Sequence, residues 1–340
     1  MDTSPWLSVL IPVYNVELYL QACVESILMQ ADEQVEIVLL NDASTDGSVQ
    51  VISRLQQSWP GRLRVLHHDR NRGLSAARNT MLDAARGRYV WFVDSDDLMA
   101  PGAIGELRAT VDRDAPDLVL CDFSVLRERP RLKHRLRGES HRRTFIGPSG
   151  RTLTDRSLLF AGVLEGVNLH AWSKIAKRDL WADDLRFPQG RYFEDMMVIP
   201  RLVLRAQSFH HVARPWIRYR QRQGSILATM SMQKAQDMSR SLLGVREALA
   251  SAPFQPTPRA QFALAYLAAR NYIGAARYVA KHHPQHQAAR LREFRQDFMQ
   301  TISLDLRELR QAYLSRGWIW RWLRLQHWLR QAPVGSSEPR

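Results

Sequence analysis

The sequence predicts an α/β fold, in which a Rossmann-like, mostly parallel sheet has helices on both faces and is followed by a C-terminal helical region. Through about the first 125 residues, short apolar runs alternate with longer segments of helical spacing. This alternation is typical of right-handed β-α-β units, whose strands lie parallel and whose crossover helices cover the sheet. From about Ser231 onward only helical spacing remains.

The local patterns place the individual elements. Runs such as LSVLIPV and VEIVLLN have the continuous apolar character of strands that are buried on both faces. In VELYLQACVESILMQ, the side chains of Leu20, Cys23 and Ile27 fall on one helical face. We expect strands at residues 7–13, 35–41, 62–68, 88–94 and 117–123, and helices at 16–30, after the cap residues 44–46, and at 74–85.

Composition and charge limit the classes of protein that fit. The chain has 340 residues, enough for a sizeable core, and its net charge of +14 indicates either an anionic partner or simple solubility. The two cysteines and the absence of a leader-like start or a long apolar run predict a cytoplasmic protein with at most a peripheral membrane contact. We expect a main domain at 1–225 with halves 1–125 and 126–225, a helical region at 226–332 and a disordered tail at 333–340.

Three acids follow the predicted strand YVWFV. Asp94, Asp96 and Asp97 would repel one another unless a positive charge lies between them. Polar residues also follow the first two strands, and ligands bind beyond the carboxyl ends of strands in open parallel sheets. A helix-capping role explains Asp42 or Asp97 alone, but it explains the acidic cluster poorly. Mg²⁺ or Mn²⁺ would explain the cluster, because these ions prefer carboxylate oxygens and take other ligands from phosphates.

Four motifs carry a resemblance to a known family. SVLIPVYNVELYLQACVESIL, EIVLLNDASTDGS, NRGLSAARNTML and GRYVWFVDSDD follow one another in the order and spacing of family 2 glycosyltransferases, which have the GT-A fold. The resemblance is strong over about the first 125 residues and continues more weakly to YRQRQGSI. It implies an inverting, metal-dependent transfer of a sugar, hexosyl or N-acetylhexosaminyl, from a nucleotide diphosphate sugar, with UDP favoured. The acceptor would be a saccharide or a lipid-linked molecule in bacterial surface polysaccharide synthesis.

The resemblance also implies roles for residues of the first half. Asp42 would hydrogen-bond the base, Asp94 would lie near the ribose and the metal, and Asp96 would bind Mg²⁺ or Mn²⁺. Arg78 would approach the phosphates, although a solvated arginine on a helix surface is an equally good interpretation. The residues expected to border the nucleotide pocket are Pro12, Tyr14 and Asn15.

In the second half, the motif FPQGRYFEDMM is similar to the family's Glu-Asp motif. It predicts Asp195 as the base that removes the acceptor hydroxyl proton, with Glu194 as its neighbour. Adjacent acids usually form a solvated turn or cap, but the flanking aromatic and Met residues indicate partial burial, which would raise a carboxylate pKa. The remaining residues predicted on the acceptor or transition-state side are Trp172, for which core packing is the alternative, Lys174, Arg220 and Arg222.

The C-terminal segment from Arg316 to Arg330 is rich in Trp and Arg, as interfacial helices are. On a helical wheel one face carries Trp and Leu residues, whereas Ile319, Trp320 and Leu323 lie elsewhere, so packing on the protein is nearly as good an interpretation. A basic protein that binds nucleic acid or membrane, and an inactive scaffold, are the alternative functions. The sequence has no recognisable nucleic-acid-binding module, and we expect no nucleic-acid partner. His170, His210 and His211 have no metal-site spacing and are expected to be structural.

Overall fold

A computed structural model describes residues 4–127, 132–182, 184–221 and 229–332. Its strands form one nine-stranded sheet in the order β3-β2-β1-β4-β8-β6-β9-β5, with β7 paired to β9. The strands are β1 Leu7–Val13, β2 Val35–Asn41, β3 Leu63–His67, β4 Tyr89–Phe92, β5 Leu98–Met99, β6 Leu118–Leu126, β7 Thr152–Leu153, β8 Lys174–Lys177 and β9 Phe209–Arg220.

Helices account for most of the rest of the described chain. Short 3-10 turns occur at Ala171–Ser173, Arg178–Trp181 and Pro284–His286. The α-helices are α1 Glu17–Leu28, α2 Ser48–Ser58, α3 Leu74–Ala84, α4 Ala103–Asp114, α5 Leu132–Leu136, α6 Arg156–Gly166, α7 Glu194–Arg205, α8 Met232–Arg240, α9 Val245–Ala250, α10 Pro258–His282, α11 Gln287–Thr301, α12 Leu306–Leu314 and α13 Ile319–Gln331.

The predicted mostly parallel sheet is confirmed. Strands β3, β2, β1 and β4 pair in parallel, and β6 pairs in parallel with β9. The antiparallel β8 lies between β4 and β6, so both of these strands run in the direction of β1. The carboxyl ends of β1, β2 and β4 therefore meet at one edge of the sheet, where the sequence places its polar clusters.

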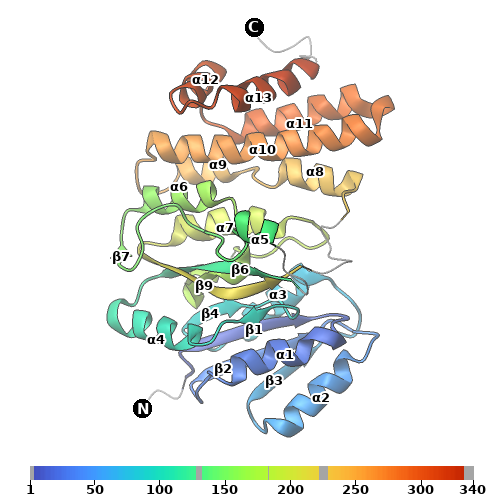
Figure 1. Cartoon of the computed structure of the whole chain (residues 1–340), viewed down its shortest axis with the longest axis vertical. Coiled ribbons are helices and arrows are strands. Elements are labelled where there is room, and N and C mark those ends of the chain that lie inside the picture. The colour runs from blue at the N-terminus through green and yellow to red at the C-terminus, as the bar shows by residue number, and fades with distance from the viewer. Residues whose placement is uncertain (1–3, 128–131, 183, 222–228, 333–340) are drawn as a thin grey trace.

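Helices cover both faces of the sheet, as the sequence predicts. Along β1, the side chains of Val9 and Ile11 join the core under α1, α2 and α4, whereas Leu10 joins the core under α3, α6 and α7. All seven residues of β1 are buried, because each face of the strand is packed against helices. This second core continues without a break into the C-terminal helices, which stack on α6 and α7 at the end far from α2 (Figure 1).

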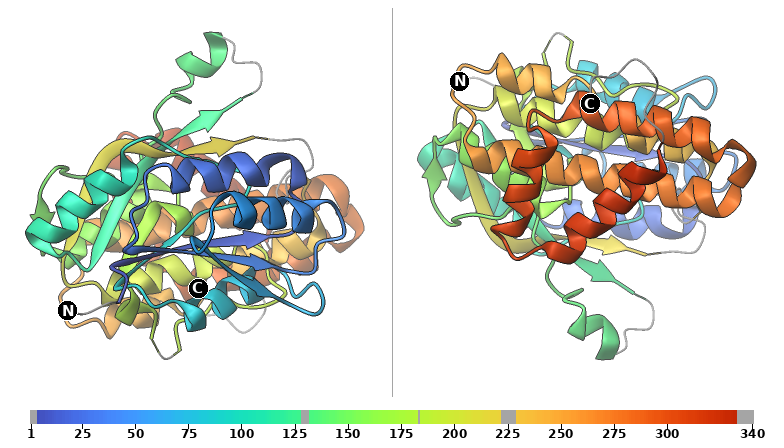
Figure 2. Two further views of the ribbon diagram at one scale, coloured as in Figure 1. Left: turned by 90° about the horizontal axis from the view of Figure 1, so that it is seen from below. Right: turned by 90° about the horizontal axis from the view of Figure 1, so that it is seen from above.

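Two further features concern the surface. The basic stretch at residues 127–145 includes the short helix α5, which stands out from the body of the molecule (Figure 2). None of the helices in the described ranges combines the length and apolar character that crossing a bilayer requires. The predicted domain boundary at 225/226 and the tail at 333–340 lie outside the described residues.

Candidate active site

A buried arginine joins the two acidic motifs. The guanidinium of Arg78, on α3, donates from Nη2 to Asp94 Oδ1 at 3.2 Å and from Nη1 to Asp195 Oδ1 at 2.8 Å. Nη1 also donates to Glu194 Oε1 at 3.0 Å. The Arg78 side chain is only 2% exposed, so its interpretation as a solvated helix residue was wrong. Arg78 is thus a positive charge between the acids of the first half and those of the second.

The surroundings of Arg78 strengthen this ion network. Its guanidinium lies beside the paired rings of Phe92 and Phe187, 5.8 and 5.1 Å from their centres, and these rings exclude water. Burial alone lowers the pKa of Arg78, but the three carboxylates more than offset this, and the net pKa is raised. The guanidinium therefore stays charged and holds the acids at fixed distances.

The start of α3 is held by Asp42 at the end of β2. Its Oδ1 accepts hydrogen bonds from the backbone N–H of Arg72 and from Nδ1 of His68, at 2.9 and 2.6 Å, and its Oδ2 accepts from Gly73 N at 2.8 Å. Asp42 does not cap the helix that follows it in the sequence, because α2 begins only after Gly47. Instead it anchors the start of α3, and through it the position of Arg78. An ionised carboxylate can accept about four hydrogen bonds, and Asp42 accepts three from His68, Arg72 and Gly73. It can therefore accept a further hydrogen bond, and the predicted contact with a base stays a prediction.

The first strand ends beside the second. Asn15, in a left-handed conformation with φ 51°, accepts at Oδ1 from Thr45 N and donates from Nδ2 to Thr45 Oγ1, at 2.8 and 3.2 Å. Tyr14 is 45% exposed, whereas Pro12 is buried and lies opposite Leu40 in the sheet. Of the residues predicted to border the nucleotide, Tyr14 and Asn15 are thus the ones that reach the surface.

The acids after β4 do not share one environment. Asp97 is fully buried, accepts from the backbone N–H of Arg220 at 2.7 Å, and leaves Oδ2 without a partner among the described residues. Burial, together with Asp94 and Asp96, raises its pKa well above the ordinary range. The Asp94 side chain is 29% exposed; burial raises its pKa to about 6, against the opposing effect of Arg78. Asp97 is thus an inward structural acid.

The chemistry of the remaining acids fits a divalent cation only in part. In the described residues, no group of three or more His, Cys, Asp or Glu side chains is placed to hold a metal ion. Asp94 and Asp96 are half-buried oxygen donors on one short turn. Two carboxylates suit Mg²⁺ or Mn²⁺ when a diphosphate and water supply the other ligands. The donor set therefore fits an ion that arrives with a phosphorylated ligand.

Glu194 and Asp195 begin α7, and their side chains are 16% and 17% exposed. Asp195 Oδ2 accepts from the backbone N–H of Ala171 at 3.1 Å, which together with Arg78 fixes the direction of this carboxylate. Burial, followed by the charge of Asp195, raises the pKa of Glu194 to about 7, although Arg78 opposes the shift. The two acids are not a solvated turn, and near neutral pH Glu194 holds a proton part of the time.

Trp172 and Lys174 lie in the core beside this pair. Trp172 is 1% exposed and its ring stacks on that of His170 at 4.7 Å, as the core-packing alternative predicts. Lys174 is fully buried, and its Nζ donates to Asn168 O and to Ser173 Oγ. Burial lowers the pKa of Lys174 to about 7. Both residues support the turn that carries Ala171, and a direct contact with an acceptor stays a prediction.

His170, which the sequence leaves as structural, belongs to an aromatic cluster beside the acidic pair. Its ring packs against those of Trp172 and Tyr219, whose centroids are 4.7 and 6.0 Å from its own. Burial lowers the pKa of His170 to about 4, although Asp195 opposes the shift, so the ring is neutral beside the acidic pair.

Arg220 reaches the acidic turn from β9. Its Nε donates to the carbonyl oxygen of Asp96 at 2.8 Å, and its guanidinium lies 5.0 Å from the ring centre of Tyr19. A positive charge is therefore present beside the turn that carries Asp96, where the sequence predicts one. Arg222, which the sequence predicts on the acceptor or transition-state side, lies outside the described residues.

Comparisons with known proteins agree with this geometry. Residues 8–161 match the family described as Glycosyl transferase family 2. These residues form a domain of this family. EpsH of Bacillus subtilis, named as a glycosyltransferase, is 30% identical over 234 residues, which are 66% of this chain and 63% of EpsH. The minor teichoic acid biosynthesis protein GgaB of the same organism is 42% identical over 97 residues, covering 28% of this chain and 11% of GgaB. The chain thus spans about 63% of the length of EpsH.

The solved structures show the same fold. The crystal structure of S. aureus TarS 1-349 in complex with UDP-GlcNAc superposes with a TM-score of 0.71 and 20% identity, and the match covers 98% of each chain. The chain therefore has the predicted GT-A fold. The residues that match the family include Arg78, Asp94 and Asp96, but they end before Glu194 and Asp195. The second half of the site comes from the part of the chain outside that match.

Proposed function

We propose that the chain is an inverting, metal-dependent glycosyltransferase that moves a hexosyl or N-acetylhexosaminyl group from a nucleotide diphosphate sugar to an acceptor hydroxyl. The observation that carries the proposal is the guanidinium of Arg78, which holds Asp94 of the donor-side motif and Asp195 of the second motif around one buried charge. Transfer needs both groups in one place, because the donor diphosphate departs as the acceptor loses its proton.

The residues divide the work as follows. Asp195, oriented by Arg78 and Ala171 N, takes the proton of the acceptor hydroxyl. The oxygen of that hydroxyl bonds to the anomeric carbon of the sugar as the bond between this carbon and the diphosphate oxygen breaks. Glu194, whose pKa is about 7, holds a proton part of the time near neutral pH and so reduces repulsion within the acidic pair. Asp94 and Asp96 would hold Mg²⁺ or Mn²⁺, which neutralises the charge that develops on the diphosphate. Arg220 adds a second positive charge beside the same turn.

The donor and acceptor are proposed from the relatives. TarS is described in complex with UDP-GlcNAc, which supports a UDP-sugar as the donor. GgaB is named for teichoic acid biosynthesis, which supports a saccharide or lipid-linked acceptor in a bacterial surface polymer pathway. Such an acceptor would place the enzyme at the inner face of the cytoplasmic membrane.

Nucleotide binding tests this proposal directly. The thermal unfolding of the purified chain would be measured with UDP, GDP, dTDP and CMP, each with and without Mn²⁺. We expect one diphosphate, UDP, to stabilise the chain only with the metal, and Asp96→Ala to abolish the shift. Glu33→Ala is the control, because Glu33 is an exposed acid before β2, at the opposite edge of the sheet. Absence of a shift with every nucleotide would refute the donor site.

A further inference from the structure

The C-terminal helices concentrate the positive charge of the molecule. Between residues 258 and 332, thirteen Lys and Arg residues oppose four Asp and Glu, so this segment carries +9 of the total charge of +14. The four acids are engaged elsewhere: Glu293 and Asp297 pair with Arg240, and Asp305 and Glu308 form the capping box of α12. Apart from Arg259, which pairs with Glu165, the arginines of α10 and α13 therefore form an excess that acids of the described residues do not neutralise.

Several of these arginines line one hollow. A cavity of about 390 Å³ between α10, α12 and α13 is bordered by Arg270, Arg277, Arg321 and Arg324, with Tyr266 and Tyr313 among its walls. Arg321 is held in place, since its Nη1 donates to Tyr266 Oη at 2.9 Å and its guanidinium lies 4.1 Å from the ring centre of Trp318. In the described part of the chain, Arg270, Arg277 and Arg324 form no ion pair with a carboxylate.

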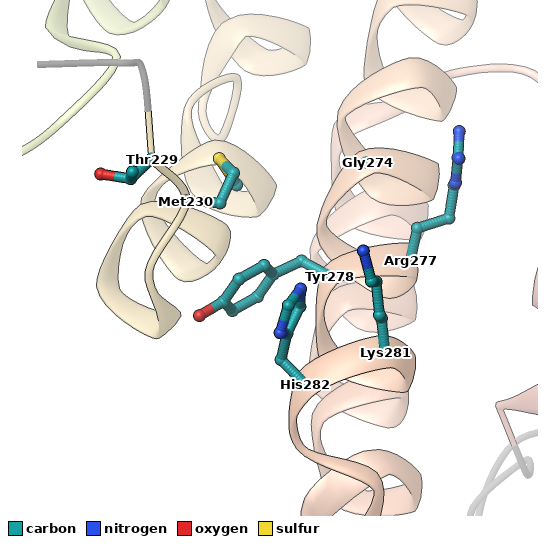
Figure 3. Close-up of a pocket in the computed structure, with 7 residues that line it drawn as sticks. All are labelled: Thr229, Met230, Gly274, Arg277, Tyr278, Lys281 and His282. Carbon is teal, nitrogen blue, oxygen red and sulfur yellow. The ribbon is translucent and has the colours of Figure 1, made fainter. Parts of the chain in front are cut away.

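A second hollow continues the first along α10. Its volume is about 500 Å³, and it shares Gly274 and Arg277 with the first. Arg277, Tyr278, Lys281 and His282, on the last turns of α10, line it. In Figure 3, Tyr278 and His282 lie on the side of Thr229 and Met230, whereas Arg277 extends from the other side of the helix. Neither hollow includes a carboxylate or a residue of the acidic cluster around Arg78. The two form one basic, tyrosine-lined groove, which is suited to phosphate groups because guanidinium binds phosphate oxygens in pairs.

An apolar surface lies beside the groove. On α13, Trp322 and Leu325 pack inward and are 7% and 0% exposed, whereas Ile319, Trp320 and Leu323 are 53%, 83% and 44% exposed. One face of this helix therefore packs on the protein, as one of the two sequence interpretations predicts, and the other face is exposed in the described structure. The exposed side chains alternate with Arg321 and Arg324, which border the groove. Large apolar side chains among arginines match the interface of an anionic bilayer, where the apolar groups enter and the cations meet headgroup phosphates.

We propose that the α10–α13 groove and the adjoining face of α13 dock the protein on an anionic lipid surface. The phosphates of the headgroups would occupy the groove at Arg277 and Arg324, and Trp320 would enter the interfacial layer beside them. The proposal rests on the membrane placement given under the proposed function, but it concerns only binding. The docking proposal can therefore be refuted while the proposed sugar transfer stands, and the sugar transfer can be refuted while the docking stands.

Vesicle sedimentation tests this proposal without any turnover. The full chain would be mixed with vesicles of phosphatidylglycerol and phosphatidylcholine, or of phosphatidylcholine alone. We expect binding only to the anionic vesicles, and the double variant Arg277→Gln/Arg324→Gln to weaken it about 25-fold, which is about fivefold for each arginine at a membrane surface. The control Arg54→Gln/Arg151→Gln removes the same charge from exposed arginines outside the groove, on α2 and before β7. Its affinity should fall much less.

A second variant separates the apolar part from the charge. Trp320→Ser, at a position already 83% exposed, should leave folding intact and weaken vesicle binding about tenfold. The vesicle binding that this variant retains should still weaken with added salt, because salt screens the attraction between the arginines and the phosphates. Equal binding by the groove variant and its control would overturn the proposal. So would equal binding to neutral vesicles, or binding of tripolyphosphate without any binding of vesicles, which would assign the groove to a soluble anion.

Discussion

Replacing Arg78 by Gln removes a positive charge that contacts all three acids of the network. Removal of one partner from a buried ion network costs about 3–5 kcal/mol, because the remaining charges stay buried without compensation. The acids here are 16–29% exposed, so we expect the loss near the lower value, about 3 kcal/mol, at pH 8. Arg78→Lys should lose less, since it keeps the charge but not the forked geometry.

The pH dependence of this loss distinguishes the ion network from simple packing. Without Arg78 the carboxylates take a higher pKa in the folded state, while their pKa in the unfolded chain stays near 4. The folded variant then binds more protons than the unfolded chain in this range, so its stability falls as pH rises through the folded pKa values. Urea unfolding followed by tryptophan fluorescence should show a larger loss at pH 8 than at pH 5. The control Arg54→Gln, at an exposed position of α2, should change stability by less than about 0.5 kcal/mol at either pH. The same loss at both pH values, or one below about 1 kcal/mol at pH 8, would refute this account of Arg78.

Three other substitutions test separate parts of the structure. Asp195→Asn should lower kcat about 10²- to 10⁴-fold with nucleotide binding retained, as measured by turnover and by the UDP thermal shift; near-normal turnover would exclude Asp195 as the base. Glu194→Gln should increase the free energy of unfolding at pH 8 by about 2–3 kcal/mol and have little effect at pH 4. The pKa of Glu194 is about 7 in the folded chain but near 4.5 in the unfolded chain, so raising the pH above about 4.5 favours the unfolded state, and Gln removes this effect. Urea unfolding at both pH values would contradict this if the gain were absent or independent of pH. Gly87→Ala should destabilise the fold by more than about 1 kcal/mol, since the added Cβ would lie 2.4 Å from the backbone nitrogen of Ser8. The control Gly105→Ala, on the open side of α4, should be neutral or stabilising. Equal melting temperatures of the two variants would contradict this prediction, because they would mean that β1 shifts at no cost.

Much of the first half was predictable, because local patterns decide it. The strands β1 and β2 have the predicted bounds, since their continuous apolar runs fit only a position buried on both faces. The polar residues that follow β1, β2 and β4 lie at one edge because parallel strands bring their carboxyl ends together. The adjacent acids Glu194 and Asp195 could likewise be selected from sequence, since charged residues among aromatic and Met side chains indicate burial.

The sequence by itself determined the α/β order, the family and the acids of the site, because each is encoded in a contiguous motif. It did not determine what neutralises those acids. Arg78 is separated by 116 and 117 residues from Glu194 and Asp195, and only folding buries its guanidinium among them. The same holds for α13, whose inner and outer faces both carry apolar residues, so that only packing against α10 decides which face is buried and which is left beside the arginines. Burial, and with it the pKa of each acid and the exposure of each apolar side chain, depends on contacts between distant segments, which no local pattern contains.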